Sequence, residues 1–227
     1  MKPFLKKQSK TKGVKNHSGT LKPDKTDSEI LAKGKEGAIK KAFVKSVKYE
    51  NVHLENISNL DEDLSLPEKG ECYKIRVQKR YNAFTFLLKI QQHHEVIDEL
   101  TILTFNMNES ALIILKKWID TGIVKDLTLC ISESVKSRMP KRYELVKDLF
   151  QHTNHRVAFT WNHCKIALVK CKSDYYVIEG SGNFSNNEEV EQYLFENSKE
   201  NYDFDKYNLV EHLFNVVKER QTRGEIV

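Results

Sequence analysis

The sequence lacks several features that define other classes of protein. No window approaches the eighteen consecutive apolar residues of a membrane-spanning helix, so we expect no stable membrane association. The basic segment from Met1 to Lys12 is not followed by an apolar stretch, so we expect no secretory signal peptide. The four cysteines have no C-x-x-C spacing, which argues against a structural zinc site. We therefore expect a cytoplasmic protein with free thiols.

Charge and composition divide the chain into three parts. Residues 1–41 contain twelve lysines and four acidic residues, a net charge of +8, whereas the whole chain of 227 residues carries +5. Because this segment has few large apolar side chains, we expect a disordered basic tail that attracts nucleic acid or, by the same charge, anionic lipid. Residues 42–70 form an extension of uncertain structure, with a strand or hairpin near 44–54. Residues 71–227 form the main domain.

Strand and helix patterns alternate along the main domain. Apolar periodicity predicts helices over approximately 82–96, 108–121, 143–150 and 205–220. Short apolar or alternating runs predict strands at 73–77, 100–105, 127–131, 155–159, 166–169 and 175–178. This order predicts an α/β fold in which helices flank a mixed sheet.

Two short motifs lie at the ends of the predicted hairpin formed by 166–169 and 175–178. His163 and Lys165 are two residues apart, so they project from the same face of an extended chain, while Cys164 between them points to the core. The hairpin brings Ser181 and Asn183, in a Gly-Ser-Gly-Asn segment, beside them. An imidazole can attack or protonate a phosphoryl group while an ammonium and an amide hold its oxygens.

The pairing of H-x-K with G-S-x-N resembles the signature of the phospholipase D superfamily. Members often carry a glutamate a short way downstream, for which Glu191 is the natural match. The superfamily's usual aspartate falls instead on Lys170. The resemblance spans about 71–220 and implies a phospholipase D-like sandwich with one motif per chain, similar to the bacterial endonuclease branch.

The resemblance also implies an activity: metal-independent phosphodiester cleavage without a cofactor, in a homodimer whose two motifs share one site. His163 of one subunit forms a phosphohistidine, and His163 of the other protonates the leaving oxygen. Lys165 and Asn183 hold the nonbridging oxygens, Glu191 orients an imidazole and Ser181 supports the loop. We expect the substrate to be nucleic acid, and DNA in particular.

Two other functions remain open at this stage. One is a nucleic-acid-binding protein of the same fold with impaired catalysis, which Lys170 in place of aspartate would favour. The other is a phospholipid headgroup hydrolase, although such relatives carry a second motif that this chain lacks. Trp161, just before the first motif, either lines a substrate groove or fills the core, and we expect the core.

Overall fold

A computed structural model describes residues 48–54, 64–77, 82–185 and 190–223. The predicted basic tail, 1–41, lies outside the described residues, as do 42–47 and 55–63 of the predicted extension. All four cysteines lie within the described residues and are free thiols, as expected. Among the described helices, none has the length and apolar character needed to cross a membrane.

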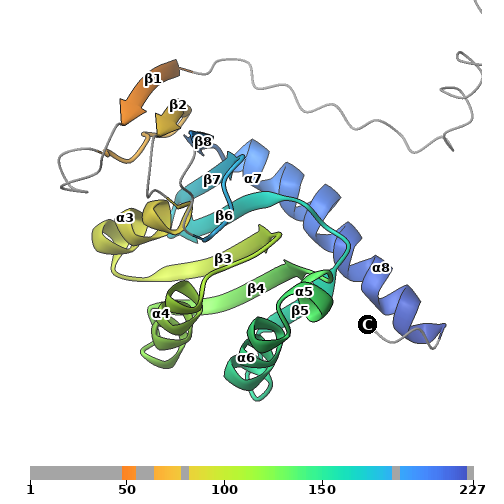
Figure 1. Ribbon diagram of the computed structural model, residues 1–227. Coiled ribbons are helices and arrows are strands. Elements are labelled where there is room, and N and C mark those ends of the chain that lie inside the picture. The colour runs from red at the N-terminus through yellow and green to blue at the C-terminus, as the bar shows by residue number, and fades with distance from the viewer. Residues whose placement is uncertain (1–47, 55–63, 78–81, 186–189, 224–227) are drawn as a thin grey trace, which may run out of the picture. The chain divides into compact units, whose positions relative to one another are not determined.

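Within these residues, eight strands form one mixed sheet in the order β1-β2-β8-β7-β6-β3-β4-β5 (Figure 1). The pairs β1–β2, β3–β4 and β4–β5 are parallel, and the remaining pairs are antiparallel. The strands are β1 (Lys48–Leu54), β2 (Glu71–Val77), β3 (Ile97–Thr104), β4 (Val124–Ser132), β5 (Arg156–Thr160), β6 (Lys165–Cys171), β7 (Asp174–Gly180) and β8 (Glu191–Asn197).

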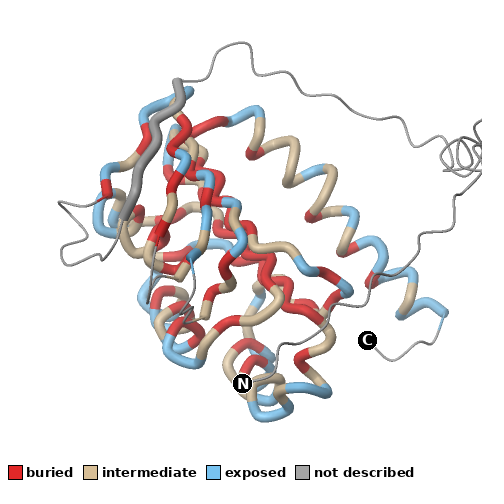
Figure 2. The backbone as a smooth tube through the Cα atoms, turned by 45° about the horizontal axis from the view of Figure 1, so that its top comes forward, coloured by how far each residue is buried: buried red, intermediate tan, exposed pale blue. Residues whose placement is uncertain are grey.

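Helices cover both faces of this sheet, which confirms the predicted mixed sheet with flanking helices. One face packs against α3, α4 and α6, and the other packs against the continuous helical run of α7, η1 and α8 (Figure 1). Buried residues accordingly run along the strands between the two helical layers (Figure 2). The helices are α3 (Phe84–His94), α4 (Glu109–Asp120), α5 (Val135–Arg138), α6 (Pro140–Phe150), α7 (Lys199–Asp205), η1 (Lys206–Val210) and α8 (Glu211–Thr222).

The central strands are apolar because helices lie on both sides of them. Residues 100–104 of β3 and 127–132 of β4 are buried without interruption, as expected for parallel strands covered on both faces. The helix between them begins where the Asn108 side chain accepts a hydrogen bond from the backbone N–H of Ala111, at 2.7 Å. It ends before Gly122, whose φ of 75° favours glycine.

The final helical run differs from its prediction. A helix was expected over 205–220, but the run begins at Lys199, where the Ser198 hydroxyl accepts a hydrogen bond from Asn201 N–H. Residues 206–210 then form a π-helical segment before α8 continues. The cap residue, rather than apolar periodicity, therefore determines where the run starts.

Candidate active site

The two motifs meet at the edge of the sheet where β6 begins and β7 ends. Lys165, the first residue of β6, pairs with Thr104 at the end of β3. On its other side, β6 pairs with β7 through Ile166 and Glu179. The next residue, Gly180, lies in register with β8. The parallel strands β3, β4 and β5 also end at this edge, which is where sites form in α/β sheets.

His163 and Lys165 lie side by side, as their spacing predicts. Lys165 Nζ is 3.1 Å from His163 Nδ1 and donates to the His163 carbonyl oxygen at 2.9 Å. His163 is exposed and Lys165 is half-buried. Partial burial lowers the pKa of Lys165 by disfavouring the charged ammonium, and the nearby Glu191 carboxylate opposes this shift. The motif thus presents an imidazole and an amine together at the surface.

Cys164 packs against the core cluster on the α7–α8 face of the sheet, as predicted. Burial raises the pKa of its thiol above the ordinary value, which disfavours the thiolate. A role as nucleophile therefore does not fit its environment.

Two further residues were not identified as part of the site from the sequence: Phe105, which contacts His163, and Arg138, which contacts Phe105. The Phe105 ring lies 5.1 Å from the His163 ring, centroid to centroid, at an interplanar angle of 54°. The Arg138 guanidinium lies 5.9 Å from the Phe105 centroid. Phe105 follows the end of β3 and Arg138 ends the short helix after β4. Their location after the carboxyl ends of parallel strands was the available signal.

Ser181 and Glu191 form the second part of the site. The Ser181 hydroxyl donates a short hydrogen bond to the Glu191 carboxylate and accepts one from Gln192 N–H at 3.0 Å. Ser181 N–H also donates to the Gln192 carbonyl at 3.0 Å. The structure thus places Glu191 against Ser181, and its expected hydrogen bond to an imidazole stays a prediction.

Asn183 is positioned by the residue that follows it. Phe184 is fully buried, forms a β-bridge with Met107, and accepts a hydrogen bond from Asn108 N–H at 2.9 Å. Met107 belongs to the same connection between β3 and α4 as Phe105, which contacts His163. The Gly-Ser-Gly-Asn segment is therefore anchored to the loop that borders the histidine.

Gly180 occupies a position where no larger residue fits. A Cβ atom there would lie 2.3 Å from Cδ1 of Tyr193 and 2.5 Å from the Gln192 carbonyl oxygen. Real Cβ atoms do not approach other atoms so closely. Glycine therefore allows β8 to pack against the end of β7, which brings Glu191 to Ser181.

Lys170, at the position of the superfamily's aspartate, lies far from the motif along β6. It lies five positions after Lys165 on the strand, a distance of about 17 Å. Its ammonium is 2.6 Å from a carboxylate oxygen of Glu99 on β3, which also accepts hydrogen bonds from Lys206 and the Tyr202 hydroxyl. In this pair the acidic residue, Glu99, therefore lies on β3, and the basic residue, Lys170, lies on β6.

Trp161 is not in the core, and this prediction was wrong. Trp161 is 81% exposed and lies in the turn between β5 and β6. Alternation explains the error, because Thr160 and Asn162 on either side occupy the buried positions. The tryptophan consequently lies at the surface two residues before His163.

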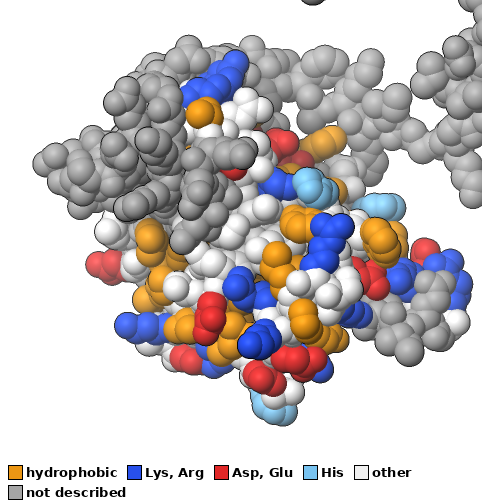
Figure 3. All heavy atoms as spheres, viewed as in Figure 1, with side chains coloured by type: hydrophobic (Ala, Val, Ile, Leu, Met, Phe, Trp, Pro, Cys, Tyr) orange, Lys and Arg blue, Asp and Glu red, His pale blue; other side chains and the backbone are white. Residues whose placement is uncertain are grey.

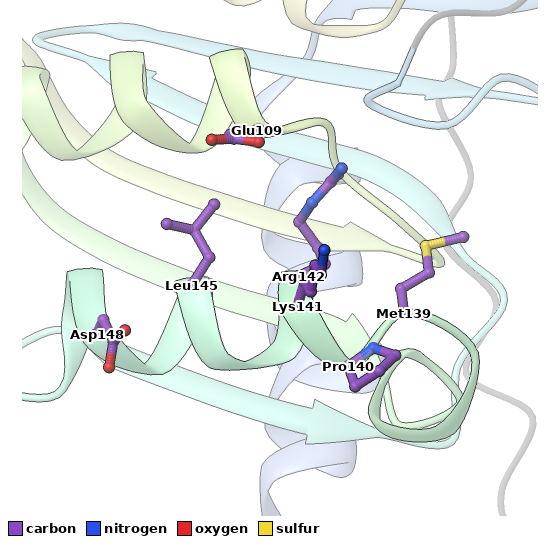
Figure 4. Close-up of a pocket in the computed structure, with 7 residues that line it drawn as sticks. All are labelled: Glu109, Met139, Pro140, Lys141, Arg142, Leu145 and Asp148. Atoms are coloured by element: carbon purple, nitrogen blue, oxygen red, sulfur yellow. The ribbon is translucent and has the colours of Figure 1, made fainter.

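One pocket includes a site residue, and a second lies beside the connection between β3 and α4. One of about 510 Å³ opens beside Ser181 and also includes Lys74 and Arg76 of β2. Another of about 710 Å³ is lined by Glu109 at the start of α4 and by residues of α6, including Arg142 (Figure 4). Arg142 also donates a hydrogen bond to the Met107 carbonyl. One view of the surface shows lysine, arginine and histidine side chains beside hydrophobic ones (Figure 3). Among the described residues, no three His, Cys, Asp or Glu side chains group closely enough to hold a metal ion.

Comparison with known proteins identifies structural likeness only. No protein-family model and no curated protein sequence matches this chain. Similar solved structures include a polyphosphate kinase from Porphyromonas gingivalis, with 15% identity and a TM-score of 0.48 over 63% of this chain and 26% of that one. They also include Nuc, a phospholipase D family member from Salmonella typhimurium, with 13% identity and a TM-score of 0.44 over 58% of this chain and 87% of that one. This chain thus spans about a quarter of the kinase. Both TM-scores are below 0.5, so conclusions about function rest on the site itself.

Proposed function

We propose that this protein is a phosphodiesterase of the phospholipase D type that cleaves nucleic acid, with DNA as the expected substrate. The observation that carries the proposal is the convergence of the H-x-K and G-S-x-N residues on one exposed edge. There His163 and Lys165 lie 3.1 Å apart, and the segment that holds Ser181 and Asn183 is anchored beside them. An imidazole, an ammonium and an amide together suit an anionic phosphodiester, and none of these groups requires a metal ion in order to act.

In this proposal His163 attacks phosphorus through Nε2. The attacking nitrogen must be unprotonated, so the ring proton must reside on Nδ1. Lys165 cannot then donate to Nδ1, and its ammonium moves to a nonbridging oxygen of the bound phosphate. The substrate therefore draws Lys165 from the imidazole as it binds. The Asn183 amide supplies a second donor to the same oxygens as charge builds on them.

The reaction needs a second acid–base group opposite the nucleophile. In-line displacement places the leaving oxygen on the far side of phosphorus from Nε2, where the same imidazole cannot protonate it. Each chain has one H-x-K motif, so we propose that His163 of a second subunit donates this proton and later activates water. A two-fold axis through the site supplies both groups symmetrically.

The proposal is tested by incubating purified protein with plasmid DNA in excess chelator. Wild-type protein should cleave, and His163→Ala should not. Lys165→Ala and Asn183→Ala should each lower turnover by about two powers of ten. The exposed histidine His93 on α3 provides a matched control, since His93→Ala should cleave normally. Full activity in His163→Ala, or complete loss of wild-type cleavage in chelator, contradicts the proposal.

Subunit mixing tests the shared site separately. Exchange of excess His163→Ala chains into wild-type protein should remove activity in the heterodimers, because each then has one imidazole. A monomer in solution with full specific activity would rule out the shared site. Binding of DNA without cleavage would instead indicate the impaired nucleic-acid-binding protein. Release of headgroups from phospholipid vesicles would indicate the lipid hydrolase.

A further inference from the structure

Trp161 is presented to solvent by a fixed turn. Its neighbours Thr160 and Asn162 are 3% and 9% exposed, whereas Trp161 is 81% exposed. Glu133 N–H donates to the Thr160 carbonyl at 2.8 Å, which ties the end of β5 to the segment after β4. Asn162 N–H donates to the same carbonyl at 2.9 Å, and its amide donates to the Thr160 hydroxyl at 2.7 Å. The backbone around the tryptophan is therefore held while its ring is left uncovered.

This exposure is unusual for the side chain concerned. A tryptophan offers about 150–250 Å² of contact surface and is highly buried on average. The other tryptophan, Trp118, is 5% exposed and stacks on Phe84 with ring centroids 5.3 Å apart. An uncovered indole on a turn whose backbone is held, two residues from His163, offers a flat face to a ligand.

The position of Trp161 relative to His163 identifies which part of a substrate it meets. Two residues of chain span at most about 7 Å, and both side chains are exposed while Asn162 between them is buried. Trp161 and His163 are therefore two exposed side chains on one short segment of chain. In a nucleotide, one sugar links the phosphate to its base, so a phosphate at His163 leaves an adjacent base within reach of the indole.

We infer that Trp161 stacks on an unpaired base next to the phosphate bound at His163, so that the substrate is single-stranded at the cut. This inference rests on the proposed nuclease function and specifies its substrate. Aromatic side chains among cations are typical of surfaces that bind single strands, and here Lys165, beside His163, supplies a cation. In a duplex, both faces of a base are covered by neighbouring bases, so stacking on Trp161 requires an unpaired base.

Tryptophan fluorescence tests this inference without relying on catalysis. In His163→Ala protein, a short oligothymidylate should quench and shift Trp161 emission, while the buried Trp118 contributes a constant background. An abasic oligomer of the same length and charge should leave Trp161 emission nearly unchanged, and a blunt duplex should affect it less than the single strand does. Equal quenching by the oligothymidylate and the abasic oligomer would overturn the inference, because the bases would then play no part.

Anisotropy of a labelled oligothymidylate provides the second measurement. In the His163→Ala background, Trp161→Leu should weaken binding by about 10-fold, and Trp161→Phe, which keeps a stacking ring, by less. Tyr207 is 66% exposed and lies in η1, so Tyr207→Leu is a matched control that should not change binding. Unchanged affinity in Trp161→Leu overturns the inference. So does Trp161 emission that varies with protein concentration alone, since that would place the ring in a subunit contact.

These results distinguish this inference from the proposed chemistry. Base-dependent quenching together with wild-type protein that does not cleave would support stacking and contradict the nuclease. Cleavage that depends on His163, together with unchanged binding in Trp161→Leu, would support the nuclease and overturn stacking.

Discussion

Replacement of Lys170 should reduce stability without reducing catalysis. Lys170 and Glu99 form an ion pair of 2.6 Å across β6 and β3, and their side chains are 31% and 24% exposed. An exposed pair contributes about 0.2–1 kcal/mol, whereas a sheltered hydrogen bond to a charged group contributes about 1.5–3 kcal/mol. This pair lies between those limits, so Lys170→Ala should lower the free energy of unfolding by about 1–2 kcal/mol.

Lys170→Asp is the more severe change and introduces the aspartate of the phospholipase D signature that the two motifs resemble. It places a carboxylate directly opposite Glu99 in the strand register, where like charges repel. We expect the free energy of unfolding to fall by about 2–3 kcal/mol, and the melting temperature to fall by about 2–4 °C for each kcal/mol. Because Lys170 lies about 17 Å from Lys165, turnover of the folded variants should match wild type.

The pH dependence of the free energy of unfolding provides an independent check of this ion pair. Partial burial raises the pKa of Glu99, but hydrogen bonds and charges of Lys170 and Lys206 outweigh burial and hold that pKa below its ordinary value. A lowered pKa adds stability that is present above the unfolded value and lost as pH falls through the folded one. The difference between wild type and Lys170→Ala should therefore shrink in acid.

Urea unfolding and plasmid cleavage in chelator measure these two effects. A double-mutant cycle with Lys170→Ala and Glu99→Gln isolates the pair from the contacts that Glu99 makes with Lys206, and should give a coupling of about 1 kcal/mol. If Lys170→Ala had wild-type stability, or lost activity as Lys165→Ala is expected to, the structural role assigned to Lys170 would be wrong.

Three further predictions concern Gly180, Asp205 and the basic tail. Gly180→Ala should lower the free energy of unfolding by about 1–3 kcal/mol and also lower turnover, because its methyl group would displace Tyr193 and the segment that bears the motif. Gly122→Ala, a control at a φ of 75° with open space around it, should lower the free energy of unfolding by about 1 kcal/mol and leave turnover unchanged. Burial and two neighbouring glutamates raise the pKa of Asp205 to about 6, so its ionised form destabilises the fold. Asp205→Asn should therefore raise the melting temperature near neutral pH, and this gain should vanish below about pH 4, where the carboxyl is protonated in both states. Deletion of residues 1–41 should leave the melting temperature unchanged but weaken DNA binding and flatten its salt dependence.

Each of these three has a result that contradicts it. Normal stability in Gly180→Ala would show that β8 does not pack tightly there. An Asp205→Asn variant that gains stability equally at all pH values would show that the gain does not come from ionisation. An unchanged salt slope after deletion of 1–41 would assign the tail to another role.

The helices and strands of this fold were predictable where one pattern of apolar residues ran through a whole segment. The runs at 100–105 and 127–131 contain no charged residue and are apolar apart from threonines, a composition typical of strands that are covered on both faces. Asn108 marks the start of α4 through a cap that depends on a single side chain. The start of the final helical run was missed because its cap, Ser198, lies outside the apolar repeat.

The site was predictable only in part, because sequence spacing fixes contacts within a strand and not between strands. The two-residue spacing of His163 and Lys165 determines that they are neighbours. The contacts of Phe105 with His163, and of Lys170 with Glu99, depend on strand order and register, which no local pattern encodes. Trp161 shows the opposite case, in which size and hydrophobicity suggested burial although alternation placed it outside.

The proposed dimer and the inferred stacking have a joint consequence for substrate orientation. A two-fold axis through the site relates not only the two imidazoles but also the two indoles, so a base on either side of the phosphate meets a Trp161. A nucleic-acid strand has a direction, but a two-fold site does not distinguish the two directions in which the strand can lie. Either His163 can therefore act as nucleophile, according to how the strand has bound. In a heterodimer of one wild-type and one His163→Ala chain, both orientations lack one of the two imidazoles, so neither orientation can restore turnover.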